Sequence, residues 1–96
     1  MTLDDVKRLL TRHEAEIRAF GVRGLWLFGS TARGEARPES DLDLLVEFEG
    51  PCSYGQYSGL RFFLEDLLGQ TVDLVLADGL RPRVRPYVER DAVRVA

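Results

Sequence analysis

The chain has 96 residues, of which 45% are hydrophobic and 30% charged, and its formal net charge is −3. This length suits one compact domain and is too short for two independent cores, so we expect residues 1–96 to form a single domain. The acidic balance excludes an extended nucleic-acid footprint, which would need a surplus of Lys and Arg. A single cysteine, Cys52, excludes an internal disulfide and a cysteine-cluster metal site.

The sequence also predicts a cytoplasmic protein that does not enter a membrane. Its apolar stretches fall far short of the roughly 20 residues that a bilayer span requires. Asp4, Asp5 and Lys7 precede any apolar run, which is unlike a signal peptide. Charge is nevertheless uneven, with an acidic block at residues 41–49 and a basic segment at residues 81–94. In the absence of other evidence, we interpret both as solvated faces or as contacts with a partner protein.

The N-terminal part predicts a helix and then a strand. Apolar residues recur at helical spacing from Leu3 to Phe20, Thr2 and Asp5 resemble a capping box, and Gly21 marks the end of the helix. His13 interrupts the apolar face of this helix, and we expect it to have a structural role without a catalytic one. Residues 25–28 form a short apolar run between two glycines, which is typical of a buried strand.

The middle of the chain predicts a turn, a strand, a helix and a strand. Residues 31–34 are expected to form a short helical turn and residues 35–40 a loop. Residues 41–48 alternate like a half-buried strand, with Leu45 on the polar face. A loop at residues 50–55, a helix at residues 57–68 that ends at Gly69, and a strand at residues 72–76 are then expected.

The C-terminal part predicts a short helix at residues 84–90 and a strand at residues 93–95. Pro86 would disrupt a helix that begins at Pro82. The full order of elements indicates an α/β (α+β) fold in which helices pack on one face of a small mixed sheet.

Two carboxylates in the second strand indicate metal chemistry. Asp41 and Asp43 are two residues apart, so they point to the same face of the strand. At a separation of about 4 Å and an effective dielectric of about 20, two such charges repel by about 4 kcal/mol unless a cation or a proton intervenes. Oxygen ligands of this kind suit Mg²⁺. If the strand of Asp73 pairs beside them, a third carboxylate joins the same face and could complete a two-ion site.

A glycine and a serine at the end of the first strand indicate phosphate binding. Gly29 lets backbone N–H groups approach a phosphate closely, and the hydroxyl of Ser30 offers a further donor. Arg33 lies one turn further on and is a weaker candidate for a phosphate contact. A Gly-Ser pair alone is common in ordinary turns, and two aspartates alone are common on exposed strands. The prediction therefore depends on the spacing between Gly29-Ser30 and the two aspartates.

Gly29 and Ser30, then ten residues, then Asp41 and Asp43 resemble the G-S-x10-D-x-D signature of the DNA polymerase β-like nucleotidyltransferase superfamily. Residues 28–48 resemble its minimal nucleotidyltransferase (MNT) family in particular, and Asp73 falls where that family keeps a third carboxylate. The resemblance implies a single MNT domain with a polymerase β palm-like fold. It also implies that Asp41 and Asp43 bind two Mg²⁺ ions and the triphosphate of ATP, while Asp73 holds the ion that faces the acceptor and helps to deprotonate its hydroxyl.

MNT proteins resemble the antitoxin half of two-gene modules whose partner is a helical HEPN protein. The resemblance therefore implies transfer of AMP from ATP to a tyrosine of a HEPN toxin partner. An alternative is a non-catalytic antitoxin that neutralises the partner by complex formation. A third reading, transfer to a small molecule or an RNA end, is disfavoured because the chain has no acceptor-binding domain and a net negative charge.

Overall fold

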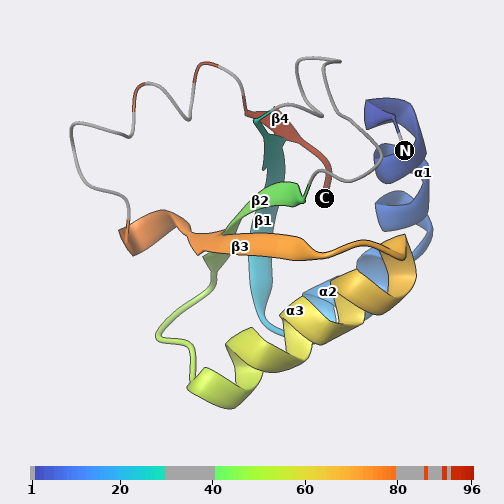
Figure 1. Ribbon diagram of the computed structural model, residues 1–96. Helices are drawn as coiled ribbons and strands as arrows, with labels where there is room; N and C mark the ends of the chain where they lie inside the picture. The colour runs from blue at the N-terminus through green and yellow to red at the C-terminus, as the bar shows by residue number, and fades with distance from the viewer. Residues whose placement is uncertain (1, 30–40, 80–85, 87–89, 91) are drawn as a thin grey trace.

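The computed structural model describes residues 2–29, 41–79, 86, 90 and 92–96 (Figure 1). The elements are α1 (Leu3–Arg12), α2 (Glu14–Ala19), β1 (Val22–Phe28), β2 (Leu42–Phe48), α3 (Tyr54–Leu68), β3 (Val72–Leu76), a 3₁₀ turn (Ala77–Gly79) and β4 (Val93–Arg94). The turn and loop predicted at residues 31–40 lie outside the described residues. So does most of the helix predicted at residues 84–90, of which Pro86 and Arg90 are helical.

The strands form one mixed sheet in the order β3-β2-β1-β4. β1 pairs antiparallel with both β2 and β4, whereas β2 and β3 are parallel and are connected through α3. This arrangement confirms the predicted α/β class. It makes β2 an interior strand, flanked by the strand that ends at Gly29 and the strand that begins near Asp73.

The hydrophobic core lies between the three helices and one face of the sheet. Leucines and valines at alternating positions of β2 and β3 form this face, as the predicted alternation requires. The helices and strands contribute to one buried cluster, whose main members are Val6, Leu10, Ile17, Leu25, Leu27, Leu42, Leu44, Val46, Leu60, Leu64, Leu68, Val72 and Leu74. The helices α1, α2 and α3 therefore cover the same face, and the other face carries Asp43, Glu47 and Asp73.

The first predicted helix is in fact two helices that meet at His13. The capping box of Thr2 and Asp5 is present, but at His13 the backbone leaves the helical region, with φ −108° and ψ 22°. Its Nδ1 lies 2.9 Å from Glu16 Oε1, and its ring meets Phe63 edge-on. The periodicity of the apolar residues continues through this break, which is why the sequence predicted one continuous helix. The structural role expected for His13 is consistent with these contacts.

The third helix begins three residues earlier than predicted. Ser53 caps it, and Ser53 and Gln56 form a second capping box, a Ser-x-x-Gln signal that the sequence interpretation missed. The side chain of Gln56 also donates a 2.5 Å hydrogen bond to the carbonyl of Phe20. The start of α3 is thereby attached to the end of α2. Gly69 ends the helix in the left-handed region, as predicted.

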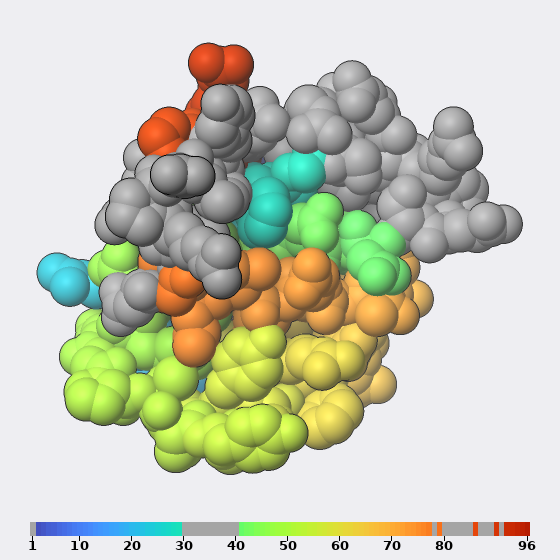
Figure 2. All heavy atoms as spheres, turned by 60° about the vertical axis from the view of Figure 1, so that its left-hand side comes forward, coloured from blue at the N-terminus to red at the C-terminus, as the bar shows by residue number. Residues whose placement is uncertain are grey.

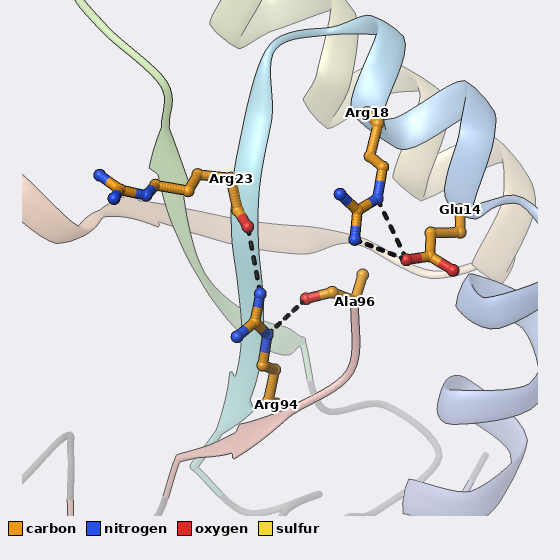
Figure 3. A network of polar contacts seen from close by, with 5 residues as sticks. All are labelled: Glu14, Arg18, Arg23, Arg94 and Ala96. Carbon is orange, nitrogen blue, oxygen red and sulfur yellow. Dashed lines mark hydrogen bonds and ion pairs between the residues drawn. The ribbon is translucent and has the colours of Figure 1, made fainter.

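The C-terminal strand is short and is fastened to β1 by Arg94 (Figure 3). Its Nε donates to the carbonyl of Ala96 at 3.0 Å, and its Nη2 donates to the carbonyl of Arg23 at 3.2 Å. The guanidinium also lies 5.5 Å from the ring centroid of Trp26, a cation–π contact. A nearby ion pair within α2 joins Arg18 to Glu14 at 2.8 Å. The contacts of Arg94 with Arg23 and Trp26 hold β4 against the strand that leads to Gly29.

The second face of the sheet is less polar than predicted. Leu45, which the alternation assigned to the polar face, is only 6% exposed and pairs in register with Trp26 of β1 and Val75 of β3. None of the helices in the described part of the chain has the length and apolar character needed to cross a bilayer.

Candidate active site

The register of the sheet brings Asp43 and Asp73 together. Asp43 of β2 is the direct partner of Asp73 in the parallel pair and of Phe28 in the antiparallel pair. Neighbouring strands are roughly 4.8 Å apart, and side chains at paired positions point to the same face. Phe28, Asp43 and Asp73 therefore form one row on the face opposite the helices. In Figure 2 the end of β1 (teal), the start of β2 (green) and β3 (orange) lie side by side.

Gly29 lies immediately against the carboxylate of Asp43. Its φ of +77° belongs to the left-handed region, which favours glycine. A Cβ atom built at this position would lie 3.2 Å from Asp43 Cγ and would collide with Asp43 Oδ2. The missing side chain thus leaves room for the backbone to turn directly beside the carboxylate. The sequence predicted that this glycine lets backbone N–H groups approach a phosphate, and phosphate binding here stays a prediction.

Asp41 lies just before β2 and is exposed. The adjacent Leu42 donates its N–H to the carbonyl of Thr71 at 3.0 Å, which places Asp41 next to the turn that enters β3. Asp43 is half-buried and Asp73 is exposed. The three candidate carboxylates are therefore at one end of the β2–β3 pair, although they differ in burial. Ser30 and Arg33, the other predicted nucleotide-binding residues, lie outside the described residues.

The side chains do not form a closed metal cluster. Among residues 2–29, 41–79, 86, 90 and 92–96, no three His, Cys, Asp or Glu side chains gather into a group that could hold a metal ion. The donor set still fits Mg²⁺, because it consists of carboxylate oxygens and because Gly29 keeps the space beside Asp43 clear. Binding of two Mg²⁺ ions by Asp41, Asp43 and Asp73 thus stays a prediction.

Two supporting residues escaped the sequence interpretation. Phe28 closes the carboxylate row on the β1 side, and its place became evident only from the strand register. Tyr57 of α3 donates a 2.5 Å hydrogen bond from its hydroxyl to the carbonyl of Leu74, the residue that follows Asp73. The structure gives this tyrosine a role in holding β3.

Comparison with known proteins agrees with this geometry. The family profile described as "Nucleotidyltransferase domain" matches residues 6–95, nearly the whole chain. The chain belongs to this nucleotidyltransferase family. A protein adenylyltransferase MntA from Thermococcus cleftensis is 43% identical over 96 residues, which cover 99% of this chain and 97% of the relative. The signature and the sheet thus belong to an enzyme fold that transfers nucleotides.

Solved structures show the same architecture. A structure described as a candidate minimal nucleotidyltransferase superposes with a TM-score of 0.84 at 41% identity, covering 97% of this chain and 95% of that one. The MNT antitoxin fold is also found in a complex with a tri-AMPylated HEPN toxin from Shewanella oneidensis. That match has a TM-score of 0.67 at 18% identity and covers 94% of this nucleotidyltransferase and 71% of that chain. The expected fold and MNT family are confirmed.

Proposed function

We propose that this nucleotidyltransferase transfers AMP from ATP, with Mg²⁺, to a tyrosine hydroxyl of a helical HEPN-type partner and thereby acts as its antitoxin. One observation supports the proposal most directly: Asp43 pairs in register with Asp73, and the backbone of Gly29, which has no side chain, lies against Asp43. The relative from Thermococcus cleftensis is named a protein adenylyltransferase, which supports AMP as the transferred group and a protein as the acceptor.

Each residue of the site has a distinct task in the proposed reaction. Gly29, with Ser30 beside it, supplies N–H groups and a hydroxyl to the triphosphate, and Arg33 adds a positive charge. Asp41 and Asp43 would hold two Mg²⁺ ions, which when bound neutralise the triphosphate and polarise the phosphoryl oxygens. Asp73 would share one ion and lies on the edge strand β3, where an acceptor can reach it.

The transfer is a single in-line displacement. The acceptor oxygen forms a bond to the α-phosphorus of ATP as the bond to the pyrophosphate oxygen breaks. The proton of the acceptor hydroxyl passes to a carboxylate oxygen of Asp73, which acts as general base. Half-buried Asp43 is the fixed ligand in the middle of the sheet, whereas exposed Asp73 faces the incoming acceptor.

In this proposal the acceptor hydroxyl belongs to a partner protein. One solved relative with the same fold is an MNT antitoxin in complex with a HEPN toxin that carries AMP, which supports a partner of that kind. We therefore place the acceptor hydroxyl on a helical partner that docks over the carboxylate row.

The proposal is tested by incubating the purified chain with α-labelled ATP, Mg²⁺ and the HEPN-type protein encoded beside it. The wild type should label the partner, whereas Asp43→Asn, which preserves shape and removes charge, should abolish labelling. Glu47→Gln is the matched control, because Glu47 lies on the same strand but outside the carboxylate row. Its Oε1 lies 3.4 Å from Arg23 Nε. Unchanged labelling by Asp43→Asn would remove this residue from the chemistry.

The same variants separate catalysis from simple complex formation. If the chain neutralises its partner by binding alone, Asp43→Asn should still protect cells that produce the partner, and nucleotide should be dispensable. If AMP transfer is required, protection should be lost while the complex still forms.

A further inference from the structure

The exposed face of α1 carries three cations that have no ion-pair partner among the residues that the structure describes. Lys7, Arg8 and Arg12 are all exposed, and none takes part in an ion pair or a hydrogen bond within the described part of the chain. Elsewhere arginines are engaged: Arg18 with Glu14, Arg23 with Glu47 and Arg61 with Glu65. In a chain of net charge −3, three unpaired cations on one helix face make a local positive patch.

These cations line two adjoining surface hollows, which we call the α1 groove. The larger, of about 500 Å³, is lined by Asp5, Arg8, Leu9, Arg12 and Gln70. The smaller, of about 330 Å³, is lined by Lys7, Arg8, Thr11 and Arg12. Apart from the single carboxylate of Asp5, the polar groups that line the groove are cations, an amide and a hydroxyl, a set that suits an anionic ligand.

The α1 groove adjoins the carboxylate end of the sheet. Gln70 belongs to the turn between α3 and β3, and the next residue, Thr71, accepts the hydrogen bond from Leu42. Asp73 follows two residues after Thr71. Figure 1 shows α1 beside the C-terminal end of α3, where the chain turns toward β3, and Gln70 of this turn lines the groove. A molecule held in the groove therefore lies close to the reacting end of the enzyme.

The stability of α1 does not account for the three cations. Arg12 lies in the last turn, where a positive charge favours the helix end, but Lys7 and Arg8 lie further toward the N-terminus. Arg8 and Arg12 are four residues apart, a spacing at which like charges weaken a helix. Asp5 lies three residues before Arg8, whose charge, after the hydrogen bonds of Thr2, contributes to the lowered pKa of this carboxyl, but the two side chains form no ion pair in the described part of the chain.

We infer that the α1 groove docks an acidic segment of the acceptor protein, next to the hydroxyl that receives AMP; this inference rests on the proposed function. The planar guanidinium groups of Arg8 and Arg12 fit carboxylates through paired hydrogen bonds. A nucleic-acid strand is a poorer occupant, because three cations neutralise few phosphates. The groove thus gives the partner an attachment point beside the carboxylate row, where ATP and the acceptor hydroxyl meet.

The test compares the full-length chain with two groove variants: Lys7→Gln/Arg8→Gln/Arg12→Gln and the corresponding triple substitution to Glu. Affinity for the purified HEPN-type partner is measured without nucleotide by titration calorimetry, at low and at moderate salt. We expect the Glu variant to bind about tenfold or more weakly and to lose much of the salt dependence. Arg18→Glu/Arg61→Glu is the matched control, since both arginines are exposed but lie outside the groove.

Independent measurements distinguish the inference from the proposed function. ATP affinity and the unfolding temperature of the groove variants should match those of the wild type. If the Glu variant misfolds, the Gln variant still tests the inference, because Gln is a good helix former. Partner affinity unchanged in both variants would overturn the inference, even if AMP transfer is normal. Weakened binding without any AMP transfer by the wild type would overturn the proposed function alone. Loss of binding to a three-nucleotide adenylate probe, with partner affinity intact, would show a nucleic-acid site and overturn the docking inference.

Discussion

The backbone of Gly29 packs against the carboxylate of Asp43, so that a Cβ atom at position 29 would come within 3.2 Å of Asp43 Cγ. The residue that follows β1 thus lies directly against the carboxylate in the middle of the sheet.

Gly29→Ala is expected to damage both the backbone turn and the carboxylate position. The left-handed φ of +77° costs an alanine about 1–2 kcal/mol, and the new methyl group displaces Asp43. We expect AMP transfer to fall about tenfold to a hundredfold, because small displacements in an active site cost that much. Gly69→Ala is the control: it has φ +66° but no heavy atom within 4 Å of a new Cβ. It should lose stability, measured by urea unfolding, and keep its activity.

Asp73→Asn is expected to slow the chemical step and to leave the fold intact. Asp73 is exposed on an edge strand, so the change buries nothing. If its carboxylate is the general base, kcat should drop by about 10² to 10⁴ while ATP binding changes little. Asp43→Asn should instead weaken Mg²⁺-dependent ATP binding as well. Single-turnover rates and the ATP affinity from calorimetry, measured on both variants, check that Asp73 acts in the chemical step and Asp43 in ATP binding as well. An equal loss of ATP affinity in the two variants would contradict these roles.

Tyr57→Phe is expected to loosen β3. The variant removes the hydroxyl that donates to the carbonyl of Leu74 and leaves that carbonyl with one partner fewer. A loss of about 1–2 kcal/mol in the free energy of unfolding should follow. Tyr54→Phe is the comparison, because Tyr54 is 84% exposed and surface changes of this kind usually fall within about 0.5 kcal/mol. Similar losses in both variants would refute the role assigned to Tyr57.

The start of α1 is expected to respond to acid. The N–H of Thr2 donates to the Asp5 carboxylate and, with smaller contributions from the Thr2 hydroxyl and nearby Arg8, holds the pKa of Asp5 below its ordinary value of 3.8. A lowered folded-state pKa means that Asp5 stabilises the fold above pH 3.8, and that this contribution is lost as the pH falls through the folded-state pKa. Wild type and Asp5→Asn should differ in unfolding temperature at pH 7 and converge near pH 2. A difference that persists in acid would argue against this role.

The sequence predicted the middle of the fold better than its boundaries. The strand at Val72–Leu76 and the end of α3 at Gly69 agree with the prediction, because alternation and a glycine stop are local signals. The break at His13 was missed because apolar spacing continues across it. The early start of α3 was missed because Tyr54 and Gly55 are poor helix formers, and the capping box of Ser53 with Gln56 outweighs them.

The candidate site was predictable only in its chemical composition. The spacing of Gly29, Asp41 and Asp43 identified the residues, whereas the pairing of Asp43 with Asp73 depends on which strands are neighbours. That order results from packing across the whole sheet and has no local signature. The contributions of Phe28 and Tyr57 have the same origin, since both depend on contacts between distant parts of the chain.

Because β2 is interior and β3 lies at the edge, the two partners Asp43 and Asp73 differ in how firmly the sheet holds them. Edge strands detach at lower free energy than the strands they border, so backbone amides of β3 should exchange with deuterium before those of β2. Mild denaturant or warming would then inactivate the enzyme while its helices and central strands are still native. Catalytic competence would be the first property that this small domain loses.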